Sequence, residues 1–194
     1  MEKYNIILSA EEQFSREVSL GVIVTRPLTT WHYLVPGLFI IDFLRRGSVI
    51  RQYTKHFMFP RKLALDAARA IDLEEDKTSV DYRIKENIGA WLNSLNLYSP
   101  DLVQAHTDLM DVLIDYYLKL LNTEGNSYYL LIKDAYRNRD HYKAFLKKIT
   151  AAEQDVDRQL IEKTGRSVKV REKILAEQQQ VEKRRNKIMD EIFS

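Results

Sequence analysis

Apolar residues recur at spacings of three and four along most of this chain, and the pattern is clearest from residue 102 to residue 121. There the sequence LVQAHTDLMDVLIDYYLKLL places apolar side chains on one face of a helix and polar side chains on the other. Glycine and proline, which interrupt helices, number only 6 and 4 in 194 residues, and no segment alternates in the manner of a strand. The sequence therefore predicts an all-α fold, an irregular bundle of about six or seven helices.

Short polar motifs predict where several of these helices begin. Ser9 with Glu12 three residues later resembles a capping box, so we expect a helix to restart near residue 10. Pro60 suits the first turn of a helix, because its missing N–H would be unpaired there in any case. Ser99-Pro100-Asp101 and Ser127 mark two further starts. The polar residues 138–141 (NRDH) interrupt the helical pattern that follows Ser127, which predicts fraying or a kink.

The long C-terminal helix carries an incomplete coiled-coil pattern. Ile174, Val181 and Ile188 fall seven residues apart, but Gln178 and Arg185 interrupt the second position of the seam. We expect this helix to pack narrowly on its own bundle, to pack on a copy of itself, or to project.

The most unusual segment is the apolar stretch at residues 28–44, which Pro36-Gly37 divides in two. Its 17 residues are at the lower limit for a helix that crosses a membrane. Asp42 lies within it, and a carboxylate there costs about 2.5–3.5 kcal/mol. A segment bent at Pro36-Gly37 that dips into one leaflet is therefore more favourable than a span. It belongs to a predicted bundle of residues 1–163, followed by a charged amphipathic helix at residues 164–194.

A basic and aromatic segment follows the apolar one. No acidic residue lies between Asp42 and Asp66, whereas six basic residues do. An anionic membrane surface attracts such a segment, by roughly 1 kcal/mol per Lys or Arg. The residues expected to contact a membrane or a partner are Trp31, Leu34, Val35, Leu38, Phe39, Ile40, Phe43, Arg45, Arg46, Arg51, Lys55, Arg61 and Lys62.

Two function hypotheses follow from this segment. The first is a non-catalytic helical adaptor or scaffold, held peripherally or monotopically at the cytoplasmic face of a membrane. The second is a fully soluble all-α protein-interaction module that forms oligomers and uses residues 28–44 as core. A cytoplasmic location agrees with the absence of cysteine and with a first segment that does not resemble a signal peptide. A net charge of +2 does not favour nucleic acid as a partner.

The sequence offers little evidence of catalysis. Asp108, Asp111 and Asp115 share one face of a helix and are weak candidates for a metal site, which would make the chain a metal-binding helical enzyme. Helical di-iron bundles also need Glu-x-x-His motifs, and the chain has none. It contains no glycine-rich phosphate loop and no nucleophile elbow. We expect neither a cofactor nor a bound metal, and we read the aspartates as a solvated or ion-paired face.

Overall fold

The computed structural model describes residues 2–24 and 36–194, and it confirms the all-α prediction. The described residues form seven helices and no strand. The helices are α1 (Glu2–Val24), α2 (Pro36–Asp72), α3 (Lys77–Ser94), α4 (Pro100–Leu121), α5 (Tyr128–Tyr136), α6 (Arg139–Lys163) and α7 (Val168–Phe193).

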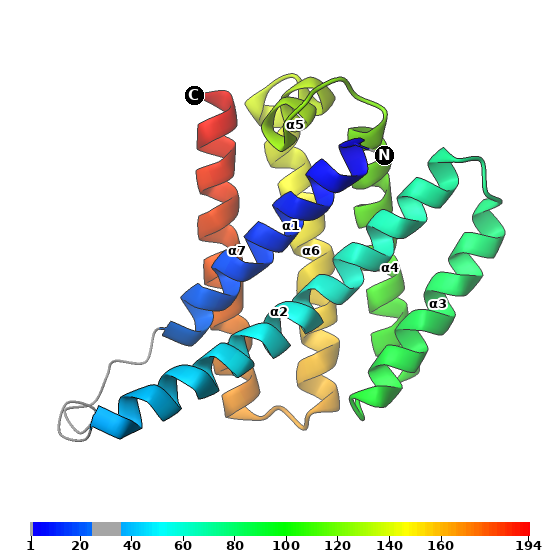
Figure 1. Ribbon diagram of the computed structural model, residues 1–194. Helices are drawn as coiled ribbons and strands as arrows, with labels where there is room; N and C mark the ends of the chain where they lie inside the picture. The colour runs from blue at the N-terminus through cyan, green and yellow to red at the C-terminus, as the bar shows by residue number, and fades with distance from the viewer. Residues whose placement is uncertain (1, 25–35) are drawn as a thin grey trace.

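The helices form a bundle in which two long helices cross the others. Figure 1 shows α1 and α2 running diagonally across α4, α6 and α7, with the end of α1 and the start of α2 at the same edge of the molecule. The first turns of α2 extend past the end of α1 at this edge (Figure 1). The short helix α5 lies at the opposite end, near the chain's C-terminus.

The central helix is α4, which contacts α1, α2, α3, α5 and α6. Its apolar stripe is the one that the sequence shows most clearly, and residues on it such as Leu102, Met110, Leu113 and Leu120 are almost completely buried. A helix with a wide apolar face can bury it only if several neighbours cover it. The strongest sequence pattern thus marks the centre of the bundle.

Helix α1 is continuous, which contradicts the predicted restart near residue 10. Ile7, Glu11, Phe14 and Val18 are all buried and lie on one helical face that passes Ser9 without a break. Packing of this unbroken stripe stabilises the helix on both sides of Ser9, so the capping motif is not used.

Helix α2 is also continuous. Pro60, which was predicted to lie in the first turn of a new helix, lies in the interior of α2 instead. An interior proline costs a helix about 3 kcal/mol or more. Packing on both sides offsets this cost: Phe59 stacks on Trp91 of α3, and Ala64, Leu65 and Ala68 are buried beyond the proline. Contacts with other helices therefore keep α2 helical despite the helix-breaking residue Pro60.

The other predicted helix starts are confirmed. The side chains of Ser99 and Ser127 accept hydrogen bonds from the backbone N–H groups of Leu102 and Leu130, and Pro100 is the first residue of α4. The polar stretch after α5 breaks the helix completely, since Asn138 caps α6 with a hydrogen bond from the N–H of His141.

Helix α7 packs on its own bundle, against α1, α5 and α6. Ile174, Val181 and Ile188, the residues spaced by seven, are buried in these contacts. At Gly21 of α1 a side chain would collide with Gln180, so the glycine allows α7 a close approach.

Candidate functional site

The residues expected to contact a membrane begin outside the described part of the chain. Trp31, Leu34 and Val35 lie there. Other members of the set lie within the first three turns of α2, at the edge of the molecule where α2 extends past α1 (Figure 1). These residues are Leu38, Phe39, Ile40, Phe43, Arg45 and Arg46.

The basic residues farther along α2 fall into two groups. Arg51 and Lys55 are exposed, and neither forms an ion pair within the described residues. Lys62 is exposed as well, but its ammonium group lies 2.9 Å from the carboxylate of Asp66 one turn later. Arg51 and Lys55 are therefore exposed cations that have no ion pair within the described residues.

Arg61 was wrongly predicted to be a surface cation. It is 5% exposed, and its guanidinium lies 3.2 Å from Glu11 of α1 and 3.0 Å from Glu153 of α6. It also lies over the ring of Phe57, 4.0 Å from the ring centre. Arg61 occupies the same helical face as the buried residue Leu65, so it must point into the bundle. Partners of opposite charge make that burial tolerable.

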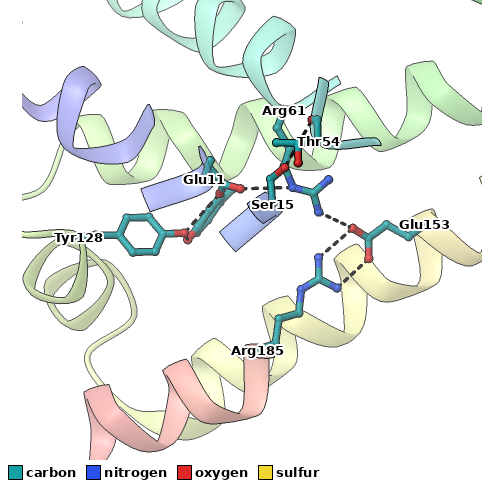
Figure 2. Close-up of polar contacts among 8 residues, drawn as sticks. Glu11, Ser15, Thr54, Arg61, Tyr128, Glu153 and Arg185 are labelled. Atoms are coloured by element: carbon teal, nitrogen blue, oxygen red, sulfur yellow. Dashed lines mark hydrogen bonds and ion pairs between the residues drawn. The ribbon is translucent and has the colours of Figure 1, made fainter. Parts of the chain in front are cut away.

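Glu153 joins Arg61 to a second arginine. Figure 2 shows its carboxylate between Arg61 and Arg185 of α7. Arg185 donates two hydrogen bonds to it, of 2.7 and 2.8 Å, in the bidentate geometry that makes such pairs strong. Burial alone would raise the pKa of Glu153, but the two arginines outweigh burial and hold that pKa below its usual value. Glu153 is therefore ionised at neutral pH.

Tyrosines complete this buried cluster. Tyr128 donates a hydrogen bond of 3.3 Å to Glu11 (Figure 2). The hydroxyl of Tyr128 also lies 2.7 Å from that of Tyr116. Burial raises the pKa of both tyrosines well above 10, so both hydroxyls stay neutral. A cavity of about 30 Å³ lies between these groups, Arg61 and Arg185. That volume is enough for a water molecule but far below the hundreds of cubic ångströms that a small-molecule site needs.

The charges in the cluster balance. Two arginines, Arg61 and Arg185, face two carboxylates, Glu11 and Glu153. The sequence offered clues in the two arginines, because Arg185 interrupts the apolar seam and Arg61 shares a face with Leu65, but it did not reveal Glu11 or Glu153. The cluster is suited to fixing the relative positions of α1, α2, α6 and α7, because a buried charge pair tolerates little displacement.

Gln178, the other polar residue that interrupts the apolar seam of α7, also has a polar partner on α6. Gln178 donates a hydrogen bond of 2.8 Å to Asp157, one turn after Glu153 on α6. Burial raises the pKa of Asp157 to about 6, with Glu153 adding to the shift and Gln178 opposing it. Both polar residues in the α7 seam thus meet polar residues of α6.

The aspartates on α4 do not form a site in the described structure. Asp108, Asp111 and Asp115 are all exposed. Asp108 accepts a hydrogen bond from Gln104, and Asp115 lies 3.9 Å from the ammonium group of Lys148 on α6. No group of three or more potential ligands comes together anywhere in residues 2–24 and 36–194. These aspartates form a solvated face.

A large open groove lies between α1 and α2. Its volume is about 1090 Å³, and it lies beside the first turns of α2, since Gly47 and Ile50 are part of its wall. The exposed residues Arg16 of α1 and Arg51 and Lys55 of α2 line it. Among the hollows of the described structure, this groove is the one that joins free cations to apolar side chains beside the predicted membrane-contact segment.

The comparisons give no relative from which a function could be transferred. No family model, no curated protein and no solved structure matches the chain. None of the helices in the described residues has the length and apolar character that crossing a membrane requires.

Proposed function

We propose that this protein is a non-catalytic helical scaffold that associates peripherally with the cytoplasmic face of an anionic membrane. The observation that supports the proposal is the position of the start of α2. This end carries the apolar sequence PGLFIIDFLRRG, extends past α1 at the edge of the molecule, and is followed on the same helix by the unpaired cations Arg51 and Lys55.

The free energies of apolar burial and charge attraction favour a reversible association of the protein with the membrane. Burial of one large apolar side chain contributes about 1.5–3 kcal/mol, so a few residues such as Leu38, Phe39 and Ile40 suffice to hold the chain at a bilayer. Each free cation near an anionic surface adds roughly 1 kcal/mol. The carboxylate of Asp42 opposes deep insertion, which favours a shallow position at the interface.

The buried cluster supports a role that does not include catalysis. Glu11, Arg61, Glu153 and Arg185 neutralise one another, and the cavity beside them is too small for a substrate. A bundle that contacts a membrane through the start of α2 is suited to presenting its other faces to protein partners.

Flotation of the full-length protein with liposomes tests the proposal. The wild type is expected to float with anionic vesicles, to float less with neutral ones, and to remain partly bound at about 0.5 M salt, where charge interactions are screened but apolar burial is not. Protein that stays at the bottom of the gradient with every vesicle would overturn the proposal.

A pair of variants separates membrane contact from a core role. Ile41→Asp is expected to abolish flotation and to leave the far-UV circular dichroism unchanged. The control, Leu73→Asp, replaces a 69% exposed leucine just after the other end of α2 and should float like the wild type. If Ile41→Asp unfolds the protein, residues 28–44 are core, and the soluble oligomeric module replaces this proposal.

A further inference from the structure

The groove between α1 and α2 combines cations and apolar surface in one concave site. Arg16 stands on α1, while Arg51 and Lys55 are one turn apart on the same face of α2. Each of these three cations is exposed, and none forms an ion pair within the described residues. Glu12, on the α1 wall, is the one carboxylate of the lining, so the groove keeps a charge of +2.

Apolar side chains share the lining with the cations. Leu20 of α1 and Ile50 and Met58 of α2 line the groove, and Leu20 is 40% exposed. The exposed hydroxyl of Ser9 adds a group that can donate a hydrogen bond. An inorganic anion would use only the cations and this hydroxyl. A ligand with a charged end and a hydrocarbon part would use the whole lining.

We propose that this groove binds a single anionic phospholipid, with its phosphate between Arg16, Arg51 and Lys55 and the start of its acyl chains against Leu20, Ile50 and Met58. The open groove, with a volume of about 1090 Å³, has room for a ligand larger than an inorganic anion. The inference rests on the proposed membrane function and specifies the lipid class that the membrane must supply.

A monomeric lipid allows the groove to be tested apart from the membrane. The probe is dihexanoyl phosphatidic acid below its critical micelle concentration, with dihexanoyl phosphatidylcholine and inorganic phosphate as comparisons, and binding is measured by calorimetry. We expect phosphatidic acid to bind more tightly than either comparison ligand. Inorganic phosphate that binds as tightly as phosphatidic acid would overturn the proposal, because the apolar lining would then contribute nothing.

A matched pair of double variants localises the binding. In Arg51→Gln/Lys55→Gln, two cations of the groove are lost, and affinity for phosphatidic acid should fall about 30-fold, since each cation contributes roughly fivefold. The control, Lys143→Gln/Lys147→Gln, removes two exposed lysines at the same spacing on α6 and should bind within about twofold of the wild type. Equal losses in both variants, or no loss in the first, would overturn the site.

The two proposals fail in different ways. If the wild type floats with anionic vesicles but does not bind monomeric phosphatidic acid, the groove proposal is wrong and membrane association remains. If phosphatidic acid binds in the groove but the protein never floats, the membrane function is wrong and the groove is a lipid site of a soluble protein.

Discussion

Replacing Glu153 by glutamine tests the buried cluster. The substitution preserves the size and one oxygen of the side chain but removes the charge that faces both arginines. Arg61 retains Glu11 at 3.2 Å. Arg185 retains only the hydroxyl of Thr150, at 3.2 Å, and the neutral oxygen of the new amide. Its side chain is 9% exposed, so water cannot solvate the orphaned charge.

The expected loss of stability follows from this geometry. Breaking a buried ion pair by removing one partner costs about 3–5 kcal/mol. We expect about 3 kcal/mol, the lower end of that range, because the side chain of Glu153 is 21% exposed and the glutamine can still accept one hydrogen bond. Equilibrium urea unfolding, followed by far-UV circular dichroism, measures the loss as a lower transition midpoint at an unchanged m-value.

Two further variants make the measurement specific. Glu162→Gln removes an exposed carboxylate from the same helix and should change stability by less than about 0.5 kcal/mol. In Glu153→Gln/Arg185→Met the orphaned charge is removed as well, and the double variant should be more stable than the sum of the single effects by about 2 kcal/mol. A loss below about 1 kcal/mol for Glu153→Gln, or strict additivity, would show that the cluster does not hold the bundle together.

Substitutions at three other positions have clear expected outcomes. Asp157 has a pKa of about 6 because it is buried, so the folded state binds its proton more tightly than the unfolded chain does, and stability falls as pH rises from about 4 to about 6. Asp157→Asn should therefore be more stable than the wild type at about pH 8, by up to about 3 kcal/mol, and similar to it near pH 4, as urea unfolding at the two pH values will show. Arg137 has φ of 59°, a conformation that costs a residue with a side chain roughly 1–2 kcal/mol, so Arg137→Gly should raise the thermal midpoint. Ser127→Ala removes the N-cap of α5 and should cost about 1 kcal/mol in urea unfolding, whereas Ser127→Asp should cost little.

The sequence was sufficient for the elements that depend on local signals. The amphipathic pattern of residues 102–121 identified the central helix, and Ser99, Pro100 and Ser127 were correctly read as helix starts. These predictions hold because a cap or an apolar stripe acts within a few residues of itself. The helix starts predicted from Ser9 and Pro60 were wrong for the opposite reason. Contacts with distant helices decide whether a helix ends at a local break signal, and here they keep α1 and α2 continuous.

The buried cluster could not be predicted because its partners are distant in sequence. Arg61 pairs with Glu153, 92 residues later, and an unpaired arginine in an apolar stripe is normally read as a surface residue. A clue was nevertheless present. Arg61 lies four residues before Leu65 on the face that α2 buries, and Arg185 interrupts the apolar seam of α7, so two cations on buried faces implied two buried carboxylates.

The fluorescence of Trp31 tests the proposed membrane contact most directly. The chain has two tryptophans, and Trp91→Phe leaves Trp31 as the single reporter. The membrane proposal predicts that adding anionic vesicles shifts its emission to shorter wavelength, and that lipids brominated near the headgroup end of the acyl chains quench it, because tryptophan is favoured at the interface. Emission that is the same with and without vesicles, and that brominated lipid does not quench, would contradict the proposal.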